Sequence, residues 1–405
     1  MHKRLREACL MLAALSITAC AGAARREHPI YWYDTATPAG FPESVRSVSE
    51  DRASFEKETE RFLTRLRMAT GAGPINVLAL SGGGAGAAFG AGALTGLSKA
   101  GIRPHFHVVT GVSAGALTAP FAFLGPAWDG ELTESFSGQQ SVKLVQFSLT
   151  GLLFGSSTFK GKPLADLVNH YATEEMLRAV AVEAAKGRLL LIATTDLDTE
   201  RTVIWDMGAI AMHGGPAALK LFRQVLIASA SIPGLFPPVM IPVETSGTIL
   251  EEMHVDGSTT ASMFIAPEIA SVLPDQLRDL RGASIYVIAN GQYGAATITT
   301  RLRTTAIAKR GIQASLHSST RGAVLATLAL AMRNDMHFNV TAIPDDYPYH
   351  GLLDLKPERM RALFTFGAEC AMRGELWTTP EGLLQRSFRA SLTLPGSPPA
   401  CPEPR

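Results

Sequence analysis

The sequence predicts a mixed α/β protein in which a central, mostly parallel sheet is flanked by helices. Short apolar runs bounded by glycine alternate with longer segments of helical periodicity, as expected when crossover helices bury strands on both faces. The composition agrees, since 46% of the residues are hydrophobic and 18% are charged. Such a chain can bury a large core, and it is neither disordered nor fibrous.

The charge balance argues against a nucleic-acid partner. The 405 residues contain 37 Lys and Arg against 36 Asp and Glu, so the formal net charge is +1. A chain this neutral lacks the basic surface with which proteins bind phosphate backbones by bulk charge.

The N-terminus reads as a secretory signal. Three basic residues precede an apolar run at 8–17, which is shorter than the roughly 20 residues of a membrane-spanning helix. The run ends in Ile-Thr-Ala-Cys at 17–20, which resembles the bacterial lipoprotein cleavage box. That resemblance implies a signal peptide at 1–19 and acyl chains on Cys20, and two or more chains give a stable membrane anchor. An ordinary signal with a nearby small-residue cleavage site is the alternative.

The residue after Cys20 bears on localisation. In lipoproteins of Gram-negative bacteria, a residue other than Asp at this position implies transport to the outer membrane, and this chain has Ala21. We therefore expect a lipoprotein of the cell envelope that is anchored in the outer membrane of a Gram-negative bacterium and faces either the periplasm or the exterior.

The remaining chain divides into three parts. Residues 20–50 carry several prolines and little periodicity, as a lipidated tether would. Residues 51–390 are expected to form one folded body, with a core at about 75–290 and a helical C-terminal part at about 299–390. Residues 391–405 form a Pro-rich tail. The expected strands lie at 75–80, 106–110, 189–194, 203–205 and 284–289, and the expected helices at 51–68, 217–229, 301–332 and 357–372, with two Ala-rich helices ending near 97 and 124.

A Gly-x-Ser-x-Gly pattern lies between a predicted strand and a predicted helix. In this context the turn is so sharp that the serine takes a strained conformation and exposes its hydroxyl. Gly111 and Gly115 flank it because a Cβ would collide with neighbouring elements. Ser113 is therefore a candidate nucleophile at a helix N-terminus, where backbone N–H groups stabilise negative charge. A glycine-rich turn with an incidental serine is the alternative.

Three consecutive glycines, Gly82, Gly83 and Gly84, follow the strand predicted at 75–80. Their N–H groups can converge on one point without obstruction by side chains, as an oxyanion hole requires. A nucleotide-binding loop is the competing interpretation. No Lys-Ser/Thr pair follows as in a P-loop, and only a relaxed G-x-G-x-x-A pattern can be traced, which disfavours a Rossmann oxidoreductase.

A candidate base follows later in the chain. Asp256 stands at the end of a short predicted strand and precedes Gly257, which places its carboxylate at a turn at the edge of the sheet. Three motifs in this order resemble the patatin-like phospholipase family, and two further segments are similar to bacterial lipoprotein members of it. The motifs are at 80–84, 111–115 and 256–257. The further segments are 192–198 with 203–208, and 228–238, and the resemblance covers about 76–290.

The resemblance implies a patatin-like three-layer fold, a catalytic domain at 51–390 and a hydrolase without cofactor or metal. Carried over by position, Ser113 is the nucleophile, Asp256 the base and Gly82 to Gly84 the oxyanion loop. The implied reaction is hydrolysis of a lipid or phospholipid ester through an acyl-enzyme. Many members carry a basic residue soon after the triple glycine, where this chain has Ala-Gly-Ala at 85–87.

An aspartate base needs a particular environment. The unperturbed pKa of Asp is about 3.9, so partial desolvation must raise it before the carboxylate can accept a proton efficiently. An α/β-hydrolase with His254 or His337 as the base is the nearest rival, although His337 is predicted on a helix. A lipoprotein that binds lipid without catalysis is the alternative from another class.

The remaining polar residues predict no metal site. Asp196, Asp198 and Asp206 lack the compact spacing of a calcium loop and are expected to cap turns around a hairpin. Of the four cysteines, Cys370 and Cys401 remain as a pair in a compartment that permits disulfides, either bridged or free.

One apolar segment bears on how lipid could reach the site. Residues 142–159 are apolar, nearly uncharged and interrupted by glycine, as a mobile flap over an acyl pocket would be. A buried helix and loop is the competing interpretation.

Overall fold

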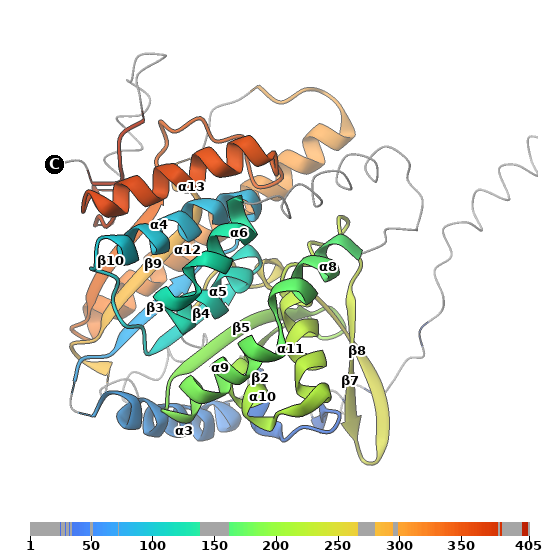
Figure 1. The fold of residues 1–405 in the computed structure, drawn as a ribbon. Helices are drawn as coiled ribbons and strands as arrows, with labels where there is room; N and C mark the ends of the chain where they lie inside the picture. Colours follow the sequence, from blue (N-terminus) through green and yellow to red (C-terminus); the bar gives the residue numbers. More distant parts are fainter. Residues whose placement is uncertain are drawn as a thin grey trace, which may run out of the picture.

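The computed structural model describes residues 25, 29, 32, 35–48, 52–71, 73–137, 162–265, 280–294, 299–379, 381–382 and 399–403. Figure 1 shows a sheet through the middle of the protein with helices on both of its faces. This three-layer arrangement confirms the predicted fold class. The predicted signal peptide, Cys20 and the apolar segment at 142–159 lie outside the described residues.

The described elements are as follows. The strands are β1 (Thr37–Pro38), β2 (Arg46–Val48), β3 (Asn76–Leu80), β4 (Val108–Val112), β5 (Leu189–Asp196), β6 (Arg201–Asp206), β7 (Val239–Thr245), β8 (Thr248–Asp256), β9 (Ser284–Gln292) and β10 (His337–Ile343). The α-helices are α3 (Arg52–Thr70), α4 (Ala87–Lys99), α5 (Ala114–Leu124), α6 (Asp129–Ser137), α8 (Lys162–Tyr171), α9 (Glu174–Ala185), α10 (Met207–His213), α11 (Gly215–Ser229), α12 (Thr304–Arg333) and α13 (Pro357–Met372).

The centre of the sheet is parallel. Strands β5, β4, β3, β9 and β10 lie side by side in that order and all run in one direction. Strands β6, β7 and β8 join antiparallel on the β5 side, and the short β1 and β2 pair with β7 and β6. Parallel strands end at the same edge of a sheet, so the loops that follow β3, β4 and β9 converge there.

Alternation along the strands separates two layers of core. In β3, Leu78 and Leu80 pack into the cluster that contains α4, α5, α11 and α13, whereas Val77 and Ala79 face the opposite side of the sheet. On that opposite side, Leu66 of α3 and Val324 of α12 belong to the covering layer. Helices α3 and α12 therefore form the third layer.

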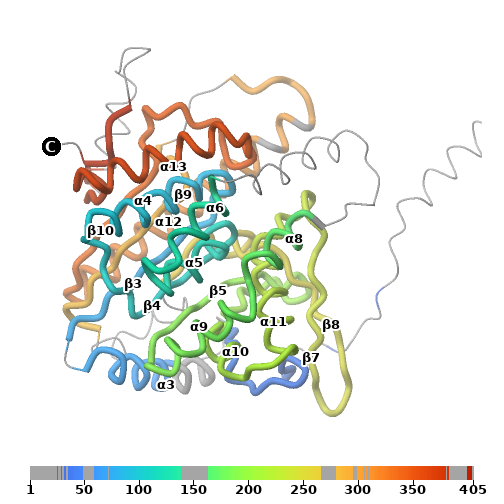
Figure 2. Tube along the Cα trace, viewed as in Figure 1, coloured from blue at the N-terminus to red at the C-terminus, as the bar shows by residue number. Residues whose placement is uncertain are grey.

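Helices α4 and α13 pack with their backbones in close contact. The two helices lie side by side (Figures 1 and 2). A Cβ on Gly92 would stand 1.9 Å from the Phe364 carbonyl oxygen, and one on Gly367 would stand 2.4 Å from that of Phe89. Glycine is required at these two positions because any side chain would separate the helices.

The C-terminal region differs from the expected pattern. Strand β10 extends the sheet beyond the core predicted at 75–290, and Cys370 and Cys401 are joined by a disulfide. Near that bridge, the Ala400 N–H donates to Asp346 Oδ2 at 3.1 Å and Cys401 is buried. The Pro-rich tail expected at 391–405 is therefore packed against the body at its described end, 399–403.

Candidate active site

Two strand ends meet beside β5. Val112, the last residue of β4, pairs with Ala193, and on the same side of β5 the next residue, Thr194, pairs with Asp256 at the end of β8. Strand β4 runs parallel to β5 and β8 runs antiparallel to it, so their carboxyl ends point toward each other. This sheet geometry brings Ser113 and Asp256 together although 143 residues separate them.

The turn after β4 has the backbone expected of a nucleophile elbow. Ser113 has φ 55° and ψ −128°, a conformation that few non-glycine residues adopt, and α5 begins at the next residue. A Cβ on Gly111 would stand 2.7 Å from the Gly115 carbonyl oxygen, and a Cβ on Gly115 would stand 2.5 Å from that of Leu80. Both flanking glycines are therefore required by close backbone approaches.

The Ser113 hydroxyl donates a hydrogen bond to Asp256 Oδ2 at 2.6 Å. The other carboxylate oxygen accepts the N–H of Ser258 at 2.8 Å, which fixes the carboxylate plane. Ser113 is 5% exposed and Asp256 is 2% exposed. Burial raises the pKa of Asp256 to about 6, and the hydrogen bonds from Ser113 and Ser258 oppose this shift only in part. At neutral pH the carboxylate is ionised and can accept a proton from the serine.

A second serine holds the elbow in place. Ser229, at the end of α11, accepts the Ser113 N–H at 3.0 Å and donates to the Ala193 carbonyl oxygen at 2.6 Å. Two residues later, the Ser231 carbonyl oxygen accepts the Asp256 N–H at 2.9 Å. These positioning contacts were not predicted from the sequence, which marked 228–238 only through its resemblance to family members.

The glycine loop lies next to the serine but does not offer all of its N–H groups. The Gly82 N–H already donates to the Ser262 carbonyl oxygen at 3.0 Å. Within the described chain, the N–H groups of Gly83 and Gly84 have no hydrogen-bond acceptor. Of the three glycines, Gly83 and Gly84 therefore remain the candidate N–H donors to an oxyanion. Gly82 anchors the loop through its hydrogen bond to Ser262.

Asn290, at the carboxyl end of β9, fixes this loop from the other side. Its N–H donates to Ser81 Oγ at 2.9 Å and its amide group donates to the Ser81 carbonyl oxygen at 2.7 Å. A Cβ on Gly83 would stand 1.9 Å from the Asn290 carbonyl oxygen, so the glycine permits the contact. No pattern in the neighbouring sequence predicts that Asn290 hydrogen-bonds to Ser81 or that its carbonyl oxygen lies against Gly83.

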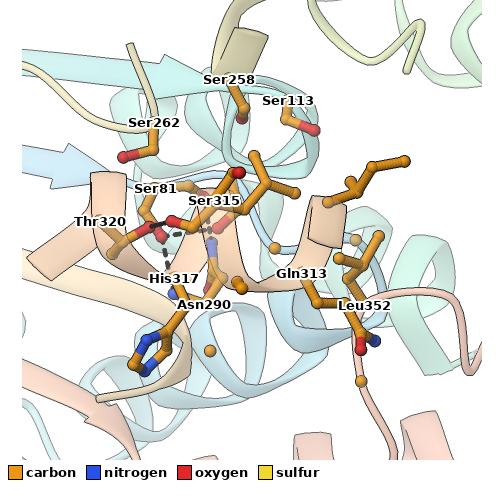
Figure 3. Close-up of a pocket in the computed structure, with 18 of the residues that line it drawn as sticks. Ser81, Ser113, Ser258, Ser262, Asn290, Gln313, Ser315, His317, Thr320 and Leu352 are labelled. Carbon is orange, nitrogen blue, oxygen red and sulfur yellow. Dashed lines mark hydrogen bonds between the residues drawn. The ribbon is translucent and has the colours of Figure 1, made fainter. Parts of the chain in front are cut away.

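A cavity of about 730 Å³ opens over these groups. Ser113, Asp256 and the glycine loop line one part of it, and residues of α12 and of the segment 349–352 line another part. Figure 3 shows Ser113 and Ser258 at one side of the cavity and residues of α12, including Ser315 and His317, across it. A volume of this size accommodates a lipid-sized substrate, and pockets of this kind are the usual place for a ligand.

The two candidate histidine bases lie elsewhere. His254 is fully buried, and its ring nitrogens contact Thr194 Oγ1 at 3.0 Å and Glu252 Oε2 at 3.1 Å. His337 was predicted on a helix, but it is the first residue of strand β10. It therefore lies at the opposite end of the parallel strands from Ser113. Neither histidine contacts the serine in this structure.

The acidic cluster near β5 is structural. Asp196 accepts the Asp198 N–H and the Thr199 hydroxyl in the β5–β6 turn, and Asp206 accepts the Ala209 N–H at the start of α10. Asp196 and Asp206 therefore make the expected capping contacts, whereas the Asp198 carboxylate pairs with Arg25 and accepts the Met253 N–H at 3.3 Å. Among the described residues, no group of three or more His, Cys, Asp or Glu side chains could hold a metal ion.

Comparison with known proteins bears on this geometry. Residues 78–268 match the patatin-like phospholipase family model. The match contains the glycine loop, Ser113 and Asp256, and at this coarse level it indicates a hydrolase of lipid esters. It ends before β9, α12 and α13.

Two other comparisons add little. A crystal structure of VipD from Legionella pneumophila is similar at 12% sequence identity with a TM-score of 0.31, over 79% of this chain and 74% of that chain. No curated protein sequence matches the chain.

Proposed function

We propose that this protein is a serine acyl hydrolase of the patatin-like type that cleaves lipid esters as a phospholipase A or lysophospholipase does, with Ser113 and Asp256 as its catalytic pair. The hydrogen bond from Ser113 Oγ to Asp256 Oδ2 at 2.6 Å, at the wall of the cavity, carries the proposal. The match of the family model to residues 78–268 supports it.

The proposed reaction has two steps. Ser113 Oγ attacks the ester carbonyl carbon while Asp256 takes the hydroxyl proton, and the N–H groups of Gly83 and Gly84 stabilise the oxyanion. Collapse of the tetrahedral intermediate breaks the ester bond, and the proton passes from Asp256 to the leaving alcohol. Asp256 then removes a proton from water as the water attacks the acyl-enzyme, and it returns this proton to Ser113 Oγ when the bond to the acyl group breaks and the fatty acid is released.

The pKa of the base suits this role. General bases work best when their pKa lies near the working pH, and burial raises that of Asp256 to about 6. The elbow conformation of Ser113 and its contact with Ser229 fix the hydroxyl before substrate binds.

We also propose that the mature chain begins at a lipidated Cys20 and resides in the cell envelope, at the outer membrane of a Gram-negative bacterium. The Ile-Thr-Ala-Cys box at 17–20 and Ala21 support this part of the proposal. Metabolic labelling with a radioactive fatty acid tests it, because Cys20→Ser should abolish labelling of the chain.

The catalytic proposal is tested by fatty-acid release from a mixed panel of phospholipids and short-chain esters, together with labelling by a fluorophosphonate. We expect Ser113→Ala to abolish labelling and to lower kcat/KM by about 10³-fold or more, and Asp256→Asn to lower it to a similar extent. His337→Ala is the matched control and should retain wild-type turnover, since that side chain lies at the far end of the sheet.

Two outcomes contradict the proposal. Turnover that survives Asp256→Asn would exclude the aspartate base. No release and no labelling by well-folded protein would leave a lipid-binding protein without catalysis.

A further inference from the structure

Helix α12 has two unlike halves. At 30 residues it is about 45 Å long. Its C-terminal half is buried through Val324, Leu330 and Ala331 on the β9–β10 side of the sheet. Among the described side chains from Thr304 to Ala323, none is buried. The N-terminal half thus overhangs the sheet edge where Ser113 lies, and residues 310–317 line the cavity.

Three exposed apolar side chains lie along one face of this helix. Ile307 is 52% exposed, Leu325 45% and Met332 75%, and spacings of 18 and 7 residues place them on one face at 100° per residue. Leu302, just before the helix, is 96% exposed. Single exposed apolar side chains are ordinary, but a row of them along one helix face marks an interaction surface.

The charge around this face has one sign. No Asp or Glu occurs between Arg281 and Asn334, whereas the chain as a whole has 36 in 405 residues. Arg301 and Arg303 are exposed beside Leu302. Arg310 lies 7 residues after Arg303 and Arg321 lies a further 11 residues on, which places the three along one edge of the apolar row. The cationic character is therefore local, since the net charge of the chain is only +1.

Cationic and apolar side chains on one exposed helix fit the surface of an anionic bilayer. Interfacial helices insert an apolar face below the headgroups while Lys and Arg side chains attract anionic lipid. None of the helices in the described ranges is long and apolar enough to cross a membrane, so α12 would lie on the surface and not span it.

We propose that residues 301–332 form a docking surface for an anionic phospholipid bilayer and that docking brings the mouth of the cavity against the lipid. The surface is continuous with the cavity, because α12 supplies both the exposed apolar row and the lining residues 310–317. The proposal rests on the proposed function for its consequence, delivery of lipid esters to Ser113, but docking itself does not depend on catalysis.

Vesicle co-sedimentation tests docking directly. The full chain carries Cys20→Ser, so that no acyl chain can anchor it, and Ser113→Ala, so that the vesicles stay intact. We expect it to bind phosphatidylcholine vesicles that contain 30% phosphatidylglycerol at least tenfold more tightly than pure phosphatidylcholine vesicles at low salt, a preference that weakens as salt screens the charges.

The test variant is Leu302→Glu/Ile307→Glu, which changes two exposed side chains that do not line the cavity. We expect at least a tenfold loss of binding to the anionic vesicles. The matched control is Val182→Glu/Ile249→Glu, which adds the same charge at two apolar side chains that are 57% and 67% exposed on other elements. The control should bind as the unchanged chain does.

Equal binding by the test and control variants overturns the docking surface, as does absence of binding to anionic vesicles. A dimer in light scattering that only the test variant loses, without vesicle binding, assigns the face to a second copy and also overturns the proposal.

Hydrolysis, measured with Ser113 restored, separates this proposal from the proposed function. The test variant should cleave a soluble short-chain ester at the wild-type rate and anionic vesicles at a rate lowered at least tenfold. A chain that hydrolyses neither substrate refutes the proposed function, while the binding result still decides the docking surface.

Discussion

Strand β8 carries two buried carboxylates, Glu252 and Asp256, whose environments differ in kind. Glu252 accepts hydrogen bonds from both terminal nitrogens of the Arg46 guanidinium, one on each carboxylate oxygen, and contacts His254. Burial alone would raise the pKa of Glu252, but Arg46 and His254 lower it to about 2. Asp256, four residues further along the same strand, has hydrogen bonds and no basic side chain among the described contacts of its carboxylate, and its pKa is raised to about 6.

The difference shows how one strand serves stability and chemistry separately. A buried carboxylate with a cation stays ionised and supports the folded state, whereas one without a cation is destabilised when ionised and becomes a base. Changes near Glu252 should therefore reduce stability and leave turnover intact, and changes at Asp256 should do the reverse.

The largest effect on stability is expected from Arg46→Met. This variant leaves Glu252 buried without its cation, and breaking such a pair costs about 3–5 kcal/mol of unfolding free energy. Urea denaturation measures the loss, and activity per folded molecule should remain near wild type. Lys186→Met is the control, because its ion pair with Glu183 is exposed on the lysine side and should contribute less than about 1 kcal/mol. Similar losses in the two variants would contradict this assignment.

The next effect is a gain in stability from Asp256→Asn. The folded-state pKa of Asp256, about 6, lies above its ordinary value of 3.8, so the wild type loses stability as pH rises between these values. Two pKa units correspond to about 3 kcal/mol. The Asn variant should be more stable than the wild type at pH 8, by up to that amount, and the advantage should vanish near pH 4. Denaturation midpoints across this range give the comparison, and a pH-independent difference would refute the cause.

A smaller effect is expected on turnover as pH changes. Because Asp256 must be ionised to act as base, kcat/KM should be constant above about pH 7 and should fall about tenfold between pH 7 and pH 5. A stopped assay with a soluble ester gives the profile. If kcat/KM instead fell with a midpoint near pH 4, the pKa of Asp256 would not be raised by burial.

The smallest effect is expected from Thr194→Val. The Thr194 hydroxyl accepts the indole N–H of Trp205 at 2.8 Å and contacts His254 at 3.0 Å, so its loss should cost about 1–2 kcal/mol of stability. Although Thr194 pairs with Asp256 in the sheet, its side chain belongs to the Glu252 region, and kcat/KM should change less than twofold. A tenfold fall in kcat/KM would mean that the two regions are coupled.

Local signals in the sequence account for the centre of the fold. The apolar runs before Gly82, Ser113 and Thr195 are the β3, β4 and β5 strands, because parallel strands buried on both faces leave no polar interruption. Strand β7 was not predicted, since Pro242 and Glu244 break its apolar pattern. Strand β10 was not predicted either, because it follows a helix within a few residues and begins with polar side chains.

The site was predictable only where its chemistry is local. The elbow and the glycine loop are each predicted by a motif of a few neighbouring residues. Ser229, Asn290 and the use of the Gly82 N–H by Ser262 depend on contacts between distant segments, and no spacing in the sequence encodes them. The disulfide between Cys370 and Cys401 was left open for the same reason.

The close packing of α4 against α13 limits how far this enzyme could be shortened. Helix α4 begins directly after the glycine loop, and its Gly92 leaves no room for anything but the backbone of α13. A fragment cut at residue 268, where the family match ends, would lack β9 from the middle of the sheet as well as α13. The smallest unit that can be produced as an independent hydrolase should therefore extend through Cys401, and its manufacture calls for oxidising conditions.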